Sequence, residues 1–309
     1  MSESCLIHWD DVAPVRRDAG PLSGAWRPLG EAAGTIGVGL RRIEIDPGMR
    51  STPVHRHTAE EEFFFVLGGS GLSWQDGKTY EVGVSDCILH KVEEEAHTLI
   101  AGPDGLDVLA FGPRRDGLLT VLPRAGVAWA GGQWVELAGG ATPWEREAAA
   151  GELDVPDPSP RPPTILALDD VPVTRNEHGR VSNVRRDFGD NMGAVTTGLG
   201  HLIVTPGRRC YPMHCHSAEE ELFVVLMGSG KVLLGDDEQP VRAGHVVSRP
   251  PGTGVAHAFE AGEEELVLLA YGTRDPNDIA YYPDSNKISF RGVGLMARIE
   301  RLDYWDGEE

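Results

Sequence analysis

Residues 53–71 read PVHRHTAEEEFFFVLGGSG: two histidines one residue apart, three glutamates, an apolar run and glycines. Almost the same stretch returns as YPMHCHSAEEELFVVLMGSG at residues 211–230, a shift of 159 residues. The same shift carries Pro47-Gly48 onto Pro206-Gly207, and after one inserted residue Leu109-Ala110-Phe111-Gly112 faces Leu269-Ala270-Tyr271-Gly272. We therefore interpret the chain as an internal duplication whose copies run almost from end to end.

A proline-rich segment separates the two copies. Residues 150–163 read AGELDVPDPSPRPP, and closely spaced prolines disfavour a helix and favour a stiff, extended connector. An ordinary loop within one domain fits less well, because the repeats begin and end on either side of this segment. We predict an N-terminal domain at 1–149, a linker at 150–163 and a C-terminal domain at 164–309.

Each copy is rich in short runs of strand-forming residues that Gly, Asp and Asn interrupt. This pattern favours antiparallel all-β domains. The clearest runs are 39–45, 62–67, 107–111, 221–226 and 266–271. Residues 142–152 are compatible with a short helix, and residues 294–302 are ambiguous between strand and helix.

The histidines of the opening stretch have the spacing of metal ligands on a strand. Because successive strand side chains point to opposite faces, His55 and His57 share one face, and Glu62 can bring in a carboxylate from the next strand. His97 follows on a later segment as a fourth candidate. The second copy repeats the set as His214, His216, Glu221 and His257.

A lone histidine is more often a hydrogen-bonded core residue or an exposed one, but matching sets in two diverged copies favour metal binding. We expect one divalent transition metal ion in each domain. Mixed imidazole and carboxylate ligation is compatible with Mn, Fe, Ni, Co, Cu or Zn. Glu60 and Glu61 compete with Glu62 as the ligand, or else face solvent or hold the imidazoles from behind.

The composition excludes several classes of partner. Lys and Arg total 28 against 48 Asp and Glu, and the formal charge of −20 repels nucleic acid and anionic membranes. No apolar run is long enough for a membrane helix and the acidic start of the chain does not look like a signal peptide, so we expect a cytoplasmic protein. The cysteines form no Cys-x-x-Cys pair, and reduced thiols are expected.

The motif resembles the first motif of the cupin superfamily. It is carried by Gly48, His55, His57, Glu62 and Gly69 in one copy and by Gly207, His214, His216, Glu221 and Gly228 in the other. The resemblance implies that Glu62 and Glu221, rather than their neighbours, are ligands. It also implies that the chain is a bicupin, with two double-stranded β-helix (jelly-roll) barrels that each hold a metal.

The second cupin motif is clear only in the C-terminal half, as Gly244, Pro250 and His257. In the N-terminal half, His90 stands where the proline is expected, before His97. The C-terminal residues 275–294 and 302–309 resemble those of a group of bacterial bicupins whose activity is not defined.

Cupins include ring-cleaving dioxygenases, oxalate decarboxylases, isomerases, a hydrolase and proteins that only hold a ligand, and the fold does not choose among them. We expect a metal-dependent enzyme with dioxygenase-like or decarboxylase-like chemistry on a small oxygen-rich substrate, because open metal positions serve catalysis. The alternatives are a non-catalytic ligand-binding or sensor bicupin and an isomerase or hydrolase. No catalytic side chain and no organic cofactor is predicted, and monomer and homodimer both stay open.

Arginines close to the motif are candidates for holding an anionic substrate. Arg50 and Arg208 precede the histidines, and Arg41 points into the barrel if Ile43 and Ile45 do. Arginines near strand edges usually reach water, so we expect these to be solvated.

Overall fold

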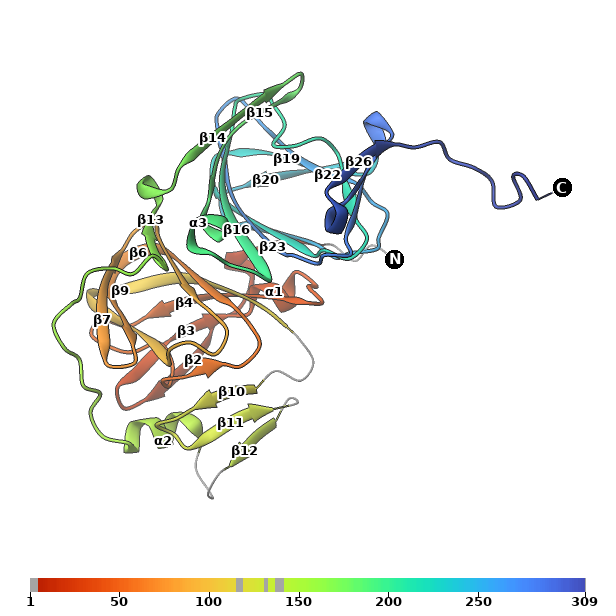
Figure 1. Cartoon of the computed structure of the whole chain (residues 1–309). Coiled ribbons are helices and arrows are strands. Elements are labelled where there is room, and N and C mark those ends of the chain that lie inside the picture. Colours follow the sequence, from red (N-terminus) through yellow and green to blue (C-terminus); the bar gives the residue numbers. More distant parts are fainter. Residues whose placement is uncertain (1–4, 115–118, 131–132, 137–141, 309) are drawn as a thin grey trace.

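The computed structural model describes residues 5–114, 119–130, 133–136 and 142–308. The chain forms two β-barrels side by side, with few and short helices, as the sequence predicts (Figure 1). The helices are α1 (Leu29–Ala32), α2 (Pro143–Ala149) and α3 (Phe188–Met192). No helix within the described ranges is long and apolar enough to cross a membrane.

The first barrel has a main sheet in the order β13-β8-β6-β9-β4-β3-β2, with β7 paired to β6. A smaller sheet in the order β12-β11-β10-β5 lies at its end remote from the second barrel, beside α2 (Figure 1). The strands are β2 (Val15–Ala19), β3 (Leu22–Arg27), β4 (Val38–Ile45), β5 (Arg56–His57), β6 (Glu62–Gln75), β7 (Lys78–Gly83), β8 (Asp86–His90), β9 (His97–Pro113), β10 (Leu119–Leu122), β11 (Val127–Ala130), β12 (Gln133–Glu136) and β13 (Ile165–Ala167).

The second barrel repeats this plan with sheets β1-β21-β18-β23-β16-β15-β14 and β20-β19-β22. A further sheet, β17-β24-β25-β26, carries the C-terminal part of the chain. The strands are β1 (Leu6–His8), β14 (Val173–His178), β15 (Val181–Asp187), β16 (Thr197–Val204), β17 (Cys215–His216), β18 (Glu221–Met227), β19 (Ser229–Leu234), β20 (Asp237–Arg242), β21 (His245–Arg249), β22 (His257–Ala261), β23 (Leu266–Thr273), β24 (Ile279–Tyr282), β25 (Lys287–Phe290) and β26 (Leu295–Arg298).

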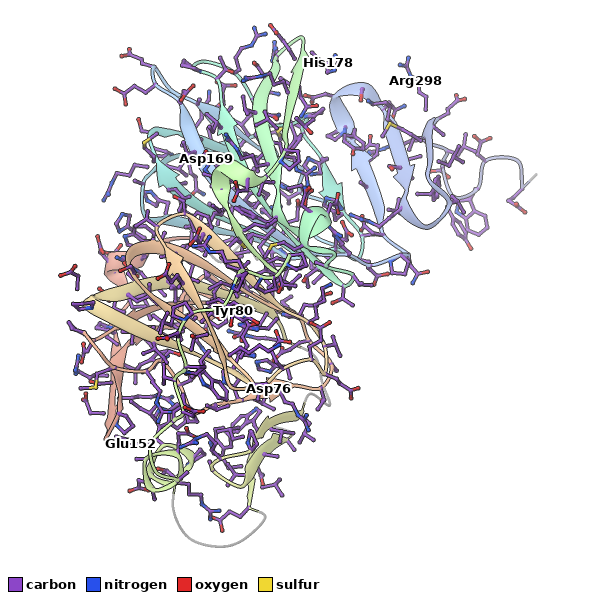
Figure 2. All side chains as sticks on the ribbon, turned by 60° about the vertical axis from the view of Figure 1, so that its left-hand side comes forward. Asp76, Tyr80, Glu152, Asp169, His178 and Arg298 are labelled. Carbon is purple, nitrogen blue, oxygen red and sulfur yellow. The ribbon has the colours of Figure 1, made fainter. Side chains whose placement is uncertain are left out.

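Several local expectations can be compared directly. The helix expected within 142–152 is α2, which Thr142 caps through a capping box with Glu145. The ambiguous segment 294–302 contains the strand β26. Residues 150–163 form neither helix nor strand. In Figure 2, Glu152 lies next to α2 at the far end of the first barrel, whereas Arg298 lies on the strands that project from the second.

The barrels exchange edge strands. β1, at the start of the chain, pairs antiparallel with β21 of the second barrel, and Ile7 lies opposite Val246. β13, which follows the linker, pairs in the same way with β8 of the first barrel, and Ile165 lies opposite Ile88. Each barrel therefore closes its main sheet with a strand from the other half of the sequence, and a cut in the linker would leave each half without that strand.

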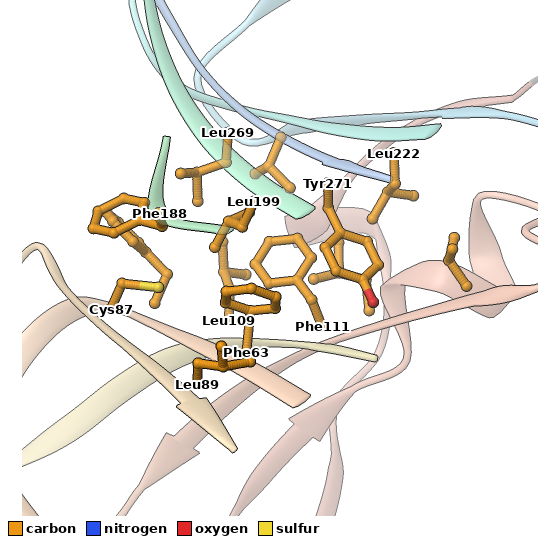
Figure 3. Close-up of a cluster of buried hydrophobic side chains, with 14 of the residues drawn as sticks. Phe63, Cys87, Leu89, Leu109, Phe111, Phe188, Leu199, Leu222, Leu269 and Tyr271 are labelled. Atoms are coloured by element: carbon orange, nitrogen blue, oxygen red, sulfur yellow. The ribbon is translucent and has the colours of Figure 1, made fainter. Parts of the chain in front are cut away.

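A shared apolar core holds the barrels together (Figure 3). Alternation along β6 divides its phenylalanines, because Phe63 and Phe65 face the second barrel while Phe64 faces the interior of the first. The ring centroid of Phe63 lies 6.2 Å from that of Tyr271, and that of Phe65 lies 6.0 Å from that of Phe188. The apolar run of the motif thus builds both a barrel core and the interface.

Two glutamates tie the barrels together reciprocally. The Glu61 carboxylate accepts hydrogen bonds from the backbone N–H groups of Val195 (2.6 Å), Thr196 (2.9 Å) and Thr197 (3.0 Å). Its counterpart Glu220 accepts hydrogen bonds from the backbone N–H groups of Ile36 (2.8 Å) and Gly37, both in the first barrel. The residue next to each predicted metal glutamate is therefore bound to the opposite barrel.

The glycine that closes each motif has a steric reason. Gly69 and Gly228 adopt φ values of 76° and 80°, where side chains are disfavoured. A Cβ atom would also collide with the backbone carbonyl of Gly105 in β9, or with that of Glu265 just before β23. Only glycine allows the strands to approach this closely at the bend.

Candidate metal centres

Site one consists of His55, His57, Glu62 and His97, which come from different segments of the first barrel. His55 bridges to His97 at the start of β9, His57 lies on β5, and Glu62 opens β6. The Nε2 atoms of His55, His57 and His97 lie 3.6, 3.3 and 3.1 Å from Oε2 of Glu62. The structure therefore brings together all the residues predicted for this site, in an arrangement that could hold a metal ion.

The other ring nitrogen of each histidine in site one has an acceptor. Nδ1 of His55 lies 2.9 Å from the carbonyl oxygen of Pro53, and Nδ1 of His97 lies 3.3 Å from that of Glu95. Nδ1 of His57 lies 2.5 Å from Oε1 of Glu60. Carbonyl and carboxylate oxygens only accept, so each Nδ1 carries a proton and each Nε2 faces Glu62, as in histidines that are positioned for a metal.

Site two repeats the arrangement with His214, His216, Glu221 and His257. The Nε2 atoms of the three histidines lie 3.7, 3.4 and 3.0 Å from Oε2 of Glu221. Nδ1 of His214 donates to the carbonyl oxygen of Pro212 at 2.9 Å. Here too, the predicted residues converge on one carboxylate oxygen.

Asp278 holds His216 of site two, and the sequence interpretation missed it. Its carboxylate accepts from Nδ1 of His216 at 2.7 Å and from the backbone N–H groups of Ala218 (2.9 Å) and Glu219 (3.1 Å). Glu219, the counterpart of Glu60, is instead paired with Arg291 at 2.6 Å. His216, Glu219 and Asp278 also form a cluster with metal-ligand spacing, but these bonds identify Asp278 as the group that orients His216.

Of the two glutamates that precede Glu62, one has a role that the sequence predicts and the other does not. Glu60 contacts His57 as expected for a residue that holds an imidazole from behind. Glu61 does neither of the things expected of it, because it is 2% exposed and bonds to the second barrel. Strand alternation explains the difference, since Glu60 and Glu62 point one way and Glu61 the other.

The strand register also corrects the interpretation of His90. Glu62 lies opposite His90 and Glu221 lies opposite Arg249, so His90 is the counterpart of Arg249, and Lys91 is the counterpart of the proline. The His90 ring stacks on His97, with centroids 3.6 Å apart. His90 is thus a wall residue behind site one.

Burial and close charges shift the protonation of both sites. Burial alone would lower the pKa of His57, but the carboxylates of Glu62 and Glu60 outweigh it and raise the pKa to about 10. Burial would raise the pKa of Glu62, yet the surrounding histidines hold it well below its usual value. Burial lowers the pKa of His257 to about 4.

Buried polar atoms in site two test whether a cation fits. His216 Nε2, His257 Nε2 and Glu221 Oε2 are buried and have no hydrogen-bond partner. Leaving such atoms without a partner is costly. A cation bound between the lone pairs of the imidazoles and the carboxylate would satisfy all of them, so these residues fit a divalent metal.

A cavity of about 670 Å³ opens onto site one. Its lining includes His55, His57 and Glu62, the side chain of Phe64, and Arg41, which was the arginine expected to point inward. Arg50, expected to be solvated, is instead buried and paired with Glu147 of α2 at 2.8 Å. Site one is therefore reachable by a small molecule, and Arg50 serves to anchor α2.

The family model for the cupin domain matches the chain at residues 41–102 and again at residues 200–271. Each matched region holds one of the two candidate metal centres, apart from the orienting Asp278. No curated protein matches the chain.

Oxalate decarboxylases are among the similar solved structures. The Lactobacillus farciminis enzyme in a formate complex is similar over 90% of this chain and 89% of its own, with 16% identity and a TM-score of 0.60. The Bacillus subtilis enzyme at pH 4.6 is similar over 88% and 76%, with 15% identity and a TM-score of 0.59. Another structure of the Bacillus enzyme, which concerns its Mn(II) centres, is similar over 88% of this chain and 77% of its own, with 15% identity and a TM-score of 0.59. At these identities the likeness shows the fold alone.

Proposed function

Both barrels match the family model for the cupin domain, and on this premise we propose that the chain is a metal-dependent enzyme acting on a small oxygen-rich substrate. The observation that carries the proposal is the convergence of imidazole Nε2 atoms on Glu62 and on Glu221. The Nδ1 atoms of His55 and His214 donate to backbone carbonyl oxygens, and site one opens to a cavity.

The donors suggest what kind of ion would bind. Imidazoles with one carboxylate suit Mn, Fe, Ni, Co, Cu or Zn, and the Mn(II) centres of the Bacillus enzyme make manganese the first ion to test. Such an ion would act as a Lewis acid or as an electron conduit for a substrate oxygen. The chain's own residues would position it: Glu60 and Asp278 by orienting His57 and His216.

The reaction type is a choice between carbon–carbon bond cleavage without net oxidation, as in a decarboxylase, and oxygen-dependent cleavage. A non-catalytic ligand-binding or sensor protein is the alternative outside enzymes. The cavity favours an enzyme over a sensor, because a site with open positions next to a substrate-sized space is what catalysis uses.

Oxygen consumption and carbon dioxide release, measured on the same metal-loaded protein, separate these functions. The compounds to test are flavonols, enediols and dicarboxylates. We expect turnover that Glu62→Gln abolishes and that an exposed-glutamate control, Glu94→Gln, retains. Turnover unaffected by Glu62→Gln and by Glu221→Gln would contradict the proposal, and tight binding of one compound without turnover would support the sensor.

A further inference from the structure

Tryptophans wall the cavity above site one. Trp26 of β3, Trp129 of β11, Trp134 of β12 and Trp144 of α2 all line it. The ring centroids of Trp129 and Trp134 are 4.9 Å apart, and those of Trp134 and Trp144 are 6.3 Å apart. Broad aromatic faces around a space above a metal site suit a flat ring more than a two-carbon acid, which would leave them without contact.

Cations line the same cavity. The Arg17 guanidinium lies 4.4 Å from the ring centroid of Trp144 and 5.9 Å from that of Trp26. Within the described part of the chain, Arg17 has no carboxylate partner, and burial together with Arg41 lowers its pKa below the ordinary value. Arg41 reaches Glu31 only at 3.9 Å, while Arg114 is firmly paired with Glu31 at 2.6 Å. Arg17 and Arg41 thus repel each other, and the only carboxylate that reaches either of them among the described residues is Glu31, at 3.9 Å from Arg41.

The equivalent positions of the second barrel are different. Trp26 lies opposite Ile43 as Arg185 lies opposite Leu202, so Arg185 replaces Trp26. The same 159-residue shift replaces Arg17 by Asn176 and Arg41 by Gly200. Arg185 is neutralised by Asp187. In sheet order, β11 and β12 correspond to β25 and β26 of the second barrel, and neither of these strands contains a tryptophan.

We propose that the cavity of site one binds a planar ring that carries a carboxylate. The tryptophans contact the ring, Arg17 and Arg41 bind the carboxylate, and oxygen substituents of the ring face His55, His57 and Glu62. A cavity of about 670 Å³ lies within the usual range for small ligands and accommodates one or two rings. The inference deepens the proposed function, and rests on it for the oxygen-to-metal contact alone.

Calorimetric titration of the manganese-loaded full chain tests this, with protocatechuate, catechol and oxalate as probes. Catechol has the ring and oxygens without the carboxylate, and oxalate has carboxylates without a ring. We expect protocatechuate to bind best and to quench tryptophan fluorescence. Arg17→Ala should weaken protocatechuate about 10- to 100-fold, the worth of a charge-assisted contact, and leave catechol nearly unchanged.

Two further variants test the ring contact and the carboxylate contact separately. Trp134, which is 39% exposed, should tolerate alanine, and Trp134→Ala should weaken both ring compounds. Arg41→Ala repeats the carboxylate test at a residue that is largely exposed and less tied to the aromatic wall. The matched control is Arg175→Ala, an exposed arginine on the equivalent hairpin of the second barrel, which should change nothing.

The outcomes separate this inference from the proposed function. Tighter binding of oxalate than of protocatechuate, or equal protocatechuate affinity in wild type, Arg17→Ala and Arg41→Ala, would overturn the inference while leaving a metal enzyme possible. A wild-type chain that holds no metal but still binds protocatechuate in an Arg17-dependent way would overturn the proposed function. The same result would support the inference that the cavity binds a ring with a carboxylate.

Discussion

Replacing Glu61 by alanine should loosen the contact between the barrels more than any surface change. The Glu61 carboxylate is buried and accepts hydrogen bonds from the backbone N–H groups of residues 195–197 and from the hydroxyls of Thr196 (3.1 Å) and Thr197 (3.0 Å). Alanine removes the acceptor and leaves these donors without a partner. The reciprocal change, Glu220→Ala, strands fewer donors among the described residues.

The magnitude follows from the number of donors. A hydrogen bond to a charged group contributes about 1.5–3 kcal/mol, and a stranded buried donor costs about 1–3 kcal/mol. The contributions are not additive, because removal of the buried charge also removes its desolvation cost and water can enter. We expect the free energy of unfolding to fall by about 3–5 kcal/mol for Glu61→Ala and by about 2–4 kcal/mol for Glu220→Ala.

Urea unfolding measures this, followed by tryptophan fluorescence and by circular dichroism. Six of the seven tryptophans precede residue 150, so fluorescence reports mainly on the first barrel, whereas circular dichroism reports on both. Glu61→Gln keeps the shape and part of the acceptor capacity and should lose less stability. The control, Glu94→Ala, changes an exposed loop glutamate. A loss in Glu61→Ala no larger than in this control would refute the reasoning.

Three other variants probe distinct parts of the molecule. Burial, reinforced by Arg186, lowers the pKa of His201 to about 4, so protonation of this histidine favours the unfolded state. As pH drops from about 6.5 to about 4, the free energy of unfolding of the wild type should therefore fall by about 2–3 kcal/mol relative to that of His201→Gln, measured from unfolding midpoints. Ile165→Ala should cost about 2–4 kcal/mol and appear in tryptophan fluorescence, because this residue packs in the first barrel; a change confined to the second barrel would contradict the strand exchange. Asp278→Asn should weaken manganese binding at site two about 10- to 100-fold in a chelator competition and leave site one unchanged, and equal weakening of both sites would count against its role with His216.

The sequence was sufficient for the barrels and for bringing the site residues together. Strand alternation placed His55 beside His57, and the resemblance to the first cupin motif selected Glu62 over Glu60 and Glu61. These inferences depend on local patterns or on a motif that occurs twice, so they needed no knowledge of contacts between distant segments.

What the sequence did not reveal depends on contacts between distant segments. Asp278 reaches His216 from 62 residues away, and no counterpart in the first copy points to it. Glu61 looked like one more acid in a polar run, and only the position of the second barrel gives it donors. β1 and β13 carry no local sign that each pairs with the opposite barrel.

The aromatic cavity was missed for a related reason. Most of the phenylalanines next to Glu62 do not line it, because they pack between the barrels. The tryptophans that line the cavity come from β3, from strands after β9 and from α2, and only the closed barrel and its additional sheet bring them together.

The metal content of the purified chain tests directly whether both candidate centres bind a metal ion. After manganese supplementation and exhaustive dialysis, elemental analysis should find about two ions per chain in wild type, as the imidazole and carboxylate donors of both barrels require. The double variants His55→Ala/His57→Ala and His214→Ala/His216→Ala should each retain about one ion. Wild-type content in either double variant, or a folded wild-type chain that retains no transition metal, would contradict the assignment.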